Sequence, residues 1–226
     1  MRMKKIAVYN NKGGVGKTTI AVHLAYYAEE LGIRTIATCI DAQADMWRWL
    51  TRGDGVLKAE CHYERGCLDV VYVRDEVPEF NDDAAELLII DCPPTIDLSL
   101  QLRPTLAVMP VHGRMGFENT ATVFGDLRDV CDVLAVINNA GRGGKRTMRE
   151  LRKGLRCIPE LKVAETELIE SDTITRAGEY YLPVWEIPYA SSSKAPAIMR
   201  ALCREIFKAA GISLTKRAPL TKKEGK

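Results

Sequence analysis

Short apolar runs alternate along the chain with stretches whose apolar residues recur at helical spacing. The runs expected to form strands are residues 6–9, 35–40, 67–73, 86–91, 106–111 and 132–139, with 67–73 as an edge strand. The expected helices begin near residue 17 and then span 44–50, 118–130, 145–156, 173–179 and 196–210. Strands that are apolar along most of their length are typical of a parallel sheet covered on both faces. The alternation therefore predicts an α/β fold, a single doubly wound domain with a mostly parallel sheet flanked by helices.

Length and composition fit one such domain. The chain has 226 residues, of which 46% are hydrophobic, and this supports a full core. We expect the domain to span 1–213, followed by a basic, disordered tail at 214–226. No apolar run approaches the ~18 residues that a membrane helix needs. The N-terminus leads directly into the first strand without a secretory signal, which favours a cytoplasmic protein.

Cysteines and charges narrow the possibilities further. The seven cysteines are an odd number and include no C-x-x-C pair, so reduced thiols are expected rather than disulfides or a zinc site. The net charge of +2 hides an asymmetry, because residues 136–226 carry 18 Lys and Arg against 10 Asp and Glu. The basic half could contact a polyanion.

Residues 10–19 carry the most specific chemical signal. They read Asn-Asn-Lys-Gly-Gly-Val-Gly-Lys-Thr-Thr and lie between the first expected strand and the first helix. Glycines let the backbone turn its N–H groups inward, and the helix adds its positive N-terminal end, so phosphates can bind. In a P-loop of this kind, Lys17 reaches the β- and γ-phosphates, Thr18 ligates Mg²⁺ and Thr19 contacts the α-phosphate. The alternative is a glycine-rich turn that only joins strand to helix.

The same stretch departs from the general P-loop pattern, since Asn11 replaces its first glycine and a second lysine, Lys12, follows. Lys-Gly-Gly-x-Gly-Lys-Thr resembles the deviant Walker A box of the ParA/MinD family of P-loop ATPases. The resemblance implies that Lys12 crosses a dimer interface to touch the partner's nucleotide, although it could be a solvated loop charge. It also implies that ATP with Mg²⁺ binds through the whole box: Lys12, Gly13, Gly14, Val15, Gly16, Lys17, Thr18 and Thr19.

Two aspartates end expected strands and should face the same crevice as the loop. By the resemblance, Asp41 belongs to switch I, where it positions the attacking water or holds Mg²⁺ through water; the alternative is a cap on helix 44–50. The family usually has a further aspartate where this chain has Cys39, which leaves the hydrolysis rate open. Asp91 ends its strand in the Walker B manner and should reach the Mg²⁺ shell. The Asp-Cys-Pro-Pro sequence that Asp91 begins resembles switch II.

The resemblance also implies contacts to the adenine base from two later segments. Family members often place an adenine-contacting asparagine after the strand at 132–139, so Asn138 is the candidate and Asn139 the alternate. An asparagine in an ordinary turn is the other interpretation. Ile187-Pro188-Tyr189 resembles the family's Ile-Pro-Arg loop beside the base, with tyrosine in place of arginine, so Pro188 is expected at the base.

A run of basic residues suggests contact with nucleic acid. At 3.6 residues per turn, Lys145, Arg149, Arg152 and Arg156 share one helical face. Such a stripe suits non-specific contact with the DNA backbone, although many charge runs are only solvated faces. Arg200 and Arg204 on the last helix are the alternative surface.

Motif order from residue 4 to residue 211 resembles the ParA-type partition branch, in its small form without an N-terminal helix-turn-helix. The tail has too few large apolar residues for a membrane helix like that of MinD. The resemblance implies a homodimer formed on ATP–Mg²⁺, non-specific binding to nucleoid DNA, and no membrane contact. It further implies weak ATP hydrolysis, stimulated by a ParB-like or other adaptor, that positions a plasmid, chromosome or other cargo. The alternatives are a kinase-like or metabolic P-loop enzyme that transfers phosphate to a small acceptor, and a nucleotide-gated scaffold that scarcely hydrolyses ATP.

Overall fold

The computed structural model describes residues 2–53, 57–74, 76–95, 101–138 and 144–215. Within these residues one sheet is built from eight strands: β1 (Lys4–Val8), β2 (Thr35–Cys39), β3 (Glu60–Arg65), β4 (Leu68–Val73), β5 (Leu87–Asp91), β6 (Leu106–Val111), β7 (Asp132–Ile137) and β8 (Lys162–Val163). The helices are α1 (Lys17–Glu30), α2 (Asp45–Leu50), α4 (Gly113–Leu127), α5 (Gly144–Arg156), α6 (Asp172–Glu179) and α7 (Ala195–Ala209), with a short 3₁₀ turn, η1, at Ala190–Ser192.

The strand order is β3-β4-β2-β5-β1-β6-β7-β8. Every pairing is parallel except that of β3 with β4. The central strands β1, β2 and β5 run side by side, and their register places Val8 and Cys39 beside Asp91. The predicted doubly wound, mostly parallel fold is confirmed, and the loop after β1 lies at the middle of the sheet's carboxyl edge.

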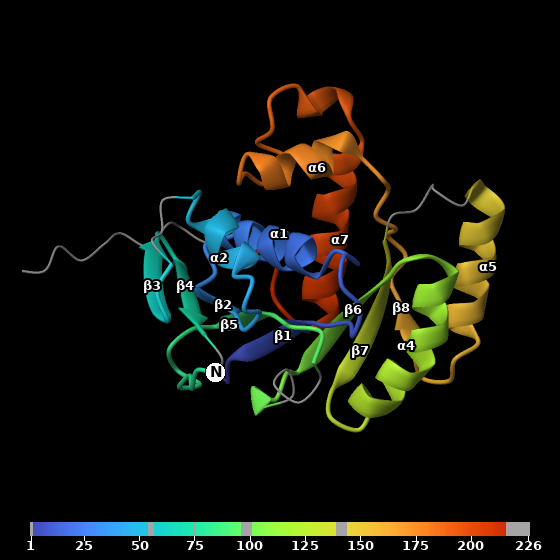
Figure 1. The fold of residues 1–226 in the computed structure, drawn as a ribbon, viewed down its shortest axis with the longest axis horizontal. Coiled ribbons are helices and arrows are strands. Elements are labelled where there is room, and N and C mark those ends of the chain that lie inside the picture. Colours follow the sequence, from blue (N-terminus) through green and yellow to red (C-terminus); the bar gives the residue numbers. More distant parts are fainter. Residues whose placement is uncertain (1, 54–56, 75, 96–100, 139–143, 216–226) are drawn as a thin grey trace, which may run out of the picture.

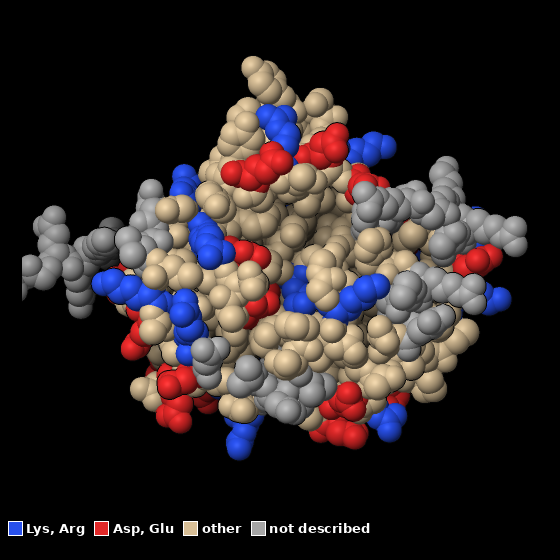
Figure 2. Space-filling model, in the orientation of Figure 1, with Lys and Arg blue, Asp and Glu red and all other residues tan. Residues whose placement is uncertain are grey.

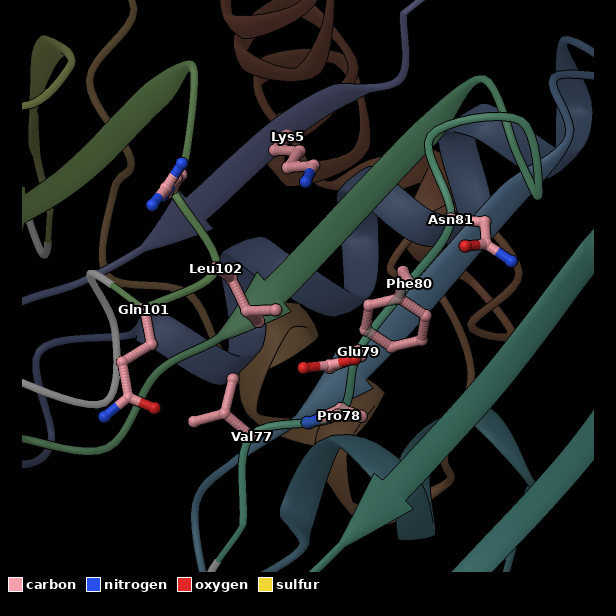
Figure 3. Close-up of a pocket in the computed structure, with 9 residues that line it drawn as sticks. Lys5, Val77, Pro78, Glu79, Phe80, Asn81, Gln101 and Leu102 are labelled. Atoms are coloured by element: carbon pink, nitrogen blue, oxygen red, sulfur yellow. The ribbon is translucent and has the colours of Figure 1, made fainter.

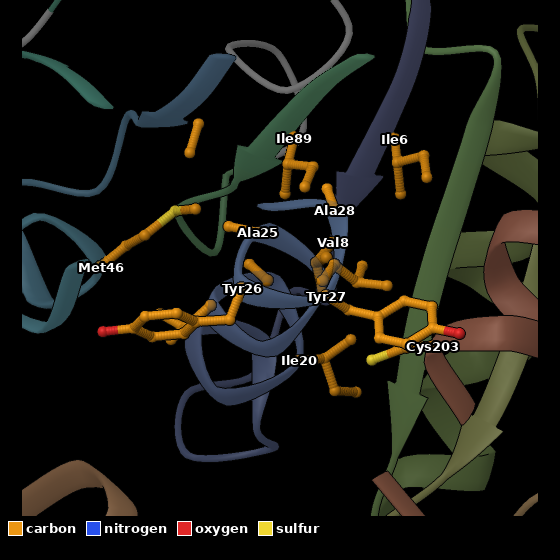
Figure 4. Packing of buried hydrophobic residues seen from close by; sticks show 14 of the residues in the cluster. Ile6, Val8, Ile20, Ala25, Tyr26, Tyr27, Ala28, Met46, Ile89 and Cys203 are labelled. Atoms are coloured by element: carbon orange, nitrogen blue, oxygen red, sulfur yellow. The ribbon is translucent and has the colours of Figure 1, made fainter. Parts of the chain in front are cut away.

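Helices cover both faces of the sheet, and each face has its own core (Figure 1). On one face α1, α2, α6 and α7 pack over the central strands, while α4 and α5 cover the other face. Figure 4 shows the first core. The side chains of Tyr26 and Tyr27 extend from opposite sides of α1, and Val8 and Ile89 point toward this helix from the strands. All five residues of β2 and of β5 are buried, since α1 packs on one face and the second core, which includes Val77, Phe80 and Leu102, lies on the other. This packing fixes the helix that follows the phosphate loop.

The sheet edge differs from the prediction. The strand predicted at 67–73 is present as β4, but it is an interior strand, since it pairs with β2 on one side and with β3 on the other. β3 was not predicted, because its sequence has polar or charged residues at Glu60, His62 and Glu64. In the structure these side chains are exposed, and the alternate residues Cys61, Tyr63 and Arg65 are buried or half-buried. The edge-strand assignment for 67–73 is therefore wrong, and β3 occupies that edge.

Other differences are smaller. The helix predicted at 118–130 begins earlier, at Gly113, and ends at Leu127. None of the helices in the described ranges combines the length and apolar character that crossing a bilayer requires. All seven cysteines are free thiols, as predicted. Of the tail predicted at 214–226, residues 216–226 lie outside the described residues, as does Asn139.

Candidate nucleotide-binding site

The loop between β1 and α1 lies beside two cavities at the carboxyl edge of the sheet. The first, of about 530 Å³, is lined by the loop together with the segments that follow β2 and β5: Gly13, Gly14, Gly16, Lys17, Thr18, Thr19, Asp41, Gln43, Asp45 and Pro94. Figure 2 shows this face of the molecule hollowed at its centre, with basic and acidic side chains meeting there. A cavity with cationic, hydroxyl and carboxylate groups on its walls suits a polyanion that carries a metal ion.

The glycines give the loop its shape. Gly14 and Gly16 have φ angles of 70° and 93°, in the region that side-chain-bearing residues rarely adopt. Asn10 secures the start of the loop, because its Nδ2 donates to the Pro110 carbonyl at 2.8 Å and its Oδ1 accepts from the Lys12 N–H at 2.9 Å. The loop is thus attached to β6 before it turns into α1.

Lys17 lies at the first turn of α1 with only 8% of its surface exposed. Its Nζ donates to the Lys12 carbonyl at 3.0 Å, so the ammonium folds back over the loop. Lys12 itself is half-buried. The predicted role of Lys12 in a partner subunit stays a prediction, since the structure contains one chain.

Thr18 and Asp91 meet although they are far apart in the sequence. The Thr18 hydroxyl donates to Asp91 Oδ2 at 2.8 Å. Asp91 is 1% exposed, and burial raises its pKa to about 7, with the charge of Asp41 acting in the same direction and Thr18 and Lys17 opposing it. Its second oxygen, Oδ1, is buried without a hydrogen-bond partner in the described structure. A hydroxyl and a buried carboxylate with an unsatisfied oxygen fit the hard oxygen donors that Mg²⁺ prefers.

Asp41 lines the first cavity and is half-buried. Its Oδ1 accepts from the Gln43 N–H at 3.0 Å, which closes the turn after β2. The alternative that Asp41 caps the following helix is wrong in detail, because α2 begins at Asp45 and its N-cap is Ala44, in a left-handed conformation. The carboxylate therefore shapes the turn and lines the cavity, where it can orient a water.

Cys39 cannot replace the aspartate that the family usually has there. It is 1% exposed, and burial followed by the charge of Asp91 raises the pKa of its thiol well above the ordinary value. The side chain is a neutral thiol with its Sγ 3.5 Å from the Asp41 carbonyl. The carboxylates that line the cavity on this side come from Asp41 and Asp45.

The second cavity, of about 260 Å³, shares Gly14, Gly16 and Thr19 with the first and extends toward α6. Its remaining walls are His112, Asn138, Leu168, Ile169, Glu170, Ser171, Ile174 and Thr175. Asn138 thus lines a cavity beside the loop, and its contact with the adenine base stays a prediction. Pro188 is exposed and lines neither cavity. Sequence reasoning missed the segment from Leu168 to Thr175 that lines the second cavity, and the predicted contact of Pro188 with the base stays a prediction.

His23 is a further residue that sequence reasoning missed. It is fully buried, and desolvation lowers its pKa to about 4. Nδ1 lies 2.6 Å from the Thr19 carbonyl, and Nε2 accepts from the Val184 N–H at 3.0 Å, so a neutral ring with Nδ1 protonated satisfies both contacts. Trp49 and Trp185 pack edge-on against the ring. His23 therefore ties the start of α1 to the segment after α6.

The predicted basic stripe is only partly available to a ligand. Arg149 is exposed, whereas Arg152 binds Glu167 at 2.9 Å and also the Ala164 and Glu165 carbonyls. Arg156 pairs with Glu165. On the alternative surface Arg200 pairs with Glu30 and Arg204 donates to the Tyr27 hydroxyl. Lys145 lies in α5, and its side chain is outside the described part of the structure.

Comparison with known proteins agrees with this geometry. A family model described as an AAA domain matches residues 3–79. The chromosome-partitioning ATPase Soj of Thermus thermophilus is 46% identical over 44 residues, which are 20% of this chain and 18% of that protein. The match thus spans less than a fifth of that curated relative.

Two solved structures share the fold. The septum site-determining protein MinD of Pyrococcus horikoshii, complexed with Mg-ADP, has a TM-score of 0.71 at 19% identity, over 92% of this chain and 98% of that one. McdA of Cyanothece, in an ATP complex, has a TM-score of 0.73 at 13% identity, over 94% of this chain and 98% of that one. At 19% and 13% identity these likenesses show the fold, and the AAA-domain model adds a sequence match over residues 3–79, which contain the loop after β1.

Proposed function

We propose that this protein is a ParA-type ATPase that binds ATP with Mg²⁺, dimerises in that state, and hydrolyses ATP to position a cellular cargo. The observation that carries the proposal is the convergence of the phosphate loop, the Thr18–Asp91 pair and Asp41 on one cavity. Relatives with the same fold include proteins crystallised with Mg-ADP and with ATP. Soj of Thermus thermophilus, which is 46% identical over 44 residues, is a chromosome-partitioning ATPase.

Different groups of the site would bind the phosphates, the Mg²⁺ ion and the attacking water. Backbone N–H groups of the loop and the N-terminus of α1 hold the phosphates. Lys17 turns from the Lys12 carbonyl to the phosphates, where its charge offsets theirs. Thr18 and Asp91 would hold Mg²⁺, which supplies charge neutralisation at the transferred phosphoryl group. Asp41 orients the attacking water.

The proposal includes an ATP-dependent homodimer, because the loop carries a second lysine, Lys12, whose N–H is fixed by Asn10. In this dimer Lys12 reaches the nucleotide of the partner. The dimer would bind nucleoid DNA without sequence preference, and Arg149 is the member of the α5 stripe best placed for it, because it is exposed. An adaptor protein would stimulate hydrolysis and release the DNA.

The test separates nucleotide binding from dimerisation. ATP–Mg²⁺ affinity is measured by calorimetry, and mass in solution is measured by light scattering with a non-hydrolysable ATP analogue. Lys17→Ala should abolish binding, whereas Lys12→Ala should bind as a monomer and fail to dimerise. Lys58→Ala, which removes an exposed lysine elsewhere, is the matched control. Normal dimers of Lys12→Ala would refute the role in the partner subunit.

The phosphotransferase alternative is tested by what raises turnover. ATP hydrolysis by the proposed enzyme should increase with DNA together with an adaptor protein. An increase that instead requires a small-molecule acceptor, with transfer of phosphate to that acceptor, would favour the kinase-like function.

A further inference from the structure

Asn138 makes a contact with the phosphate loop that its predicted role at the base does not explain. It is the first residue after β7, and its N–H donates to the Val111 carbonyl at 2.9 Å, which holds its backbone against β6. From this position its Nδ2 donates to the Val15 carbonyl at 2.6 Å. A side chain carried by one strand thus binds the backbone of the loop carried by another.

The two segments approach too closely for a side chain between them. A Cβ atom added to Gly16 would lie 2.4 Å from Nδ2 of Asn138, and Gly16 also has a φ of 93°. The backbone conformation at Gly16 favours glycine, and a side chain there would displace the Asn138 amide from its place against the loop. Asn138 and Gly16 form one packed unit.

This contact determines where a backbone N–H points. In a planar trans peptide the carbonyl and the N–H of the next residue project to opposite sides. Because Asn138 holds the Val15 carbonyl on its own side, the Gly16 N–H is directed away from Asn138. Gly16 lines both cavities, whereas Asn138 lines only the second. The orientation of the Gly16 N–H is thus set by a residue that lines the second cavity.

We infer that Asn138 is a positioning residue for phosphate binding, and that its amide fixes the Val15–Gly16 peptide in the orientation that binds phosphate. The inference rests on the proposed nucleotide site and extends it, because a residue that only contacted the base would leave the phosphate loop unaffected. Phosphate affinity should then depend on Asn138 even when the ligand has no base.

Inorganic tripolyphosphate with Mg²⁺ is the probe, since it offers the phosphates of ATP without base or ribose. Calorimetry compares its affinity with that of ATP–Mg²⁺ for the wild type, Asn138→Ala and Asn138→Asp. Asn138→Ala should weaken tripolyphosphate binding about tenfold, the effect of losing one good hydrogen bond. Asn138→Asp keeps the shape but places a carboxylate against the Val15 carbonyl, so it should weaken binding further.

Thr175→Ala is the matched control, because Thr175 lines only the second cavity and its hydroxyl donates to the Ser171 carbonyl in its own segment. It should alter ATP affinity at most and leave tripolyphosphate affinity unchanged. Circular dichroism and thermal unfolding check that each variant is folded. Weakened ATP binding with unchanged tripolyphosphate binding in both Asn138 variants would overturn this inference and leave the proposed function intact. A wild-type protein that binds neither ligand would overturn both.

Discussion

Asp91 gives a quantitative prediction, because its carboxyl is buried beside few compensating charges. Burial raises its pKa from 3.8 to about 7, so the folded protein retains a proton that the unfolded chain loses. Between about pH 4 and pH 7 the folded state binds more protons, and stability must fall as the pH rises. Below that range both states are protonated, and above it both are ionised. From pH 5.5 to pH 7 the loss is about 2 kcal/mol, at 1.36 kcal/mol for each pH step.

Asp91→Asn removes this dependence while keeping the shape and an oxygen that can accept the Thr18 hydroxyl. The nucleotide-free variant should therefore gain stability relative to the wild type as the pH rises. For a chain of this size, about 2 kcal/mol corresponds to a relative shift in Tm of ~4–8 °C between pH 5.5 and pH 7. Mg²⁺ with ATP should stabilise the wild type more than the variant, because the charged carboxylate is a ligand for the ion.

Thermal unfolding followed by circular dichroism, at a series of pH values with chelator present, measures both profiles. His23 and the other titrating groups are common to the two proteins, so the difference between their curves isolates Asp91. Parallel curves for the wild type and Asp91→Asn would show that the carboxyl has an ordinary pKa, and the electrostatic account of the site would fail.

Two further predictions concern residues outside the phosphate loop. His23→Phe leaves the buried Val184 N–H without its acceptor and should lower the free energy of unfolding in urea by about 2 kcal/mol. The wild type, but not this variant, should also lose stability as the pH falls from 6.5 toward 4, because in that range the unfolded histidine takes up a proton that the buried ring does not. Equal urea midpoints at neutral pH would contradict the bridging role. Arg149→Glu should weaken DNA retention and reduce its salt dependence without changing Tm, whereas Arg152→Glu should lower Tm because its guanidinium binds Glu167 and two carbonyls. Unchanged DNA retention in folded Arg149→Glu would place the DNA surface elsewhere, with Arg200 and Arg204 the next to test.

The local parts of the site could be predicted from the sequence because their signals are local. The glycines, Lys17 and Thr18 lie within one short loop, and an apolar run ending in an aspartate predicts both a buried strand and its carboxyl terminus. Asp91 is an example, since it is the last of the five buried residues of β5 and lies within hydrogen-bond distance of the Thr18 hydroxyl. The parallel sheet then follows from apolar strands that alternate with helices.

The parts that were missed depend on chain segments meeting at a distance. The sequence reasoning did not single out the chain that follows β8, which lines the second cavity. There the Leu168 N–H donates to the Ile137 carbonyl at 2.9 Å, so residues 164–168 run beside β7 toward the loop. No local pattern reports that pairing. A weaker signal was present in Ser171, whose hydroxyl caps α6 and so marks where this segment turns.

The basic stripe shows the same limit. Helical spacing correctly placed Arg152 and Arg156 on α5, but their partners Glu165 and Glu167 come from the chain after the helix. The spacing of residues along a helix does not show which other segments pack against that helix. Exposed Arg149 therefore differs from Arg152 only through tertiary structure.

Three side chains of the proposed site share one property: each already has an internal partner. Lys17 binds the Lys12 carbonyl, Thr18 binds Asp91, and Asn138 binds the Val15 carbonyl. For Lys17, binding of a triphosphate is an exchange of partners, so its net contribution is the difference between two interactions. The Asn138 contact is instead retained, because it orients the loop that receives the phosphates. The affinity of the site should consequently depend more on how well the loop is preorganised than on the number of contacts to the ligand, and that is why a substitution at Asn138 should reduce tripolyphosphate binding.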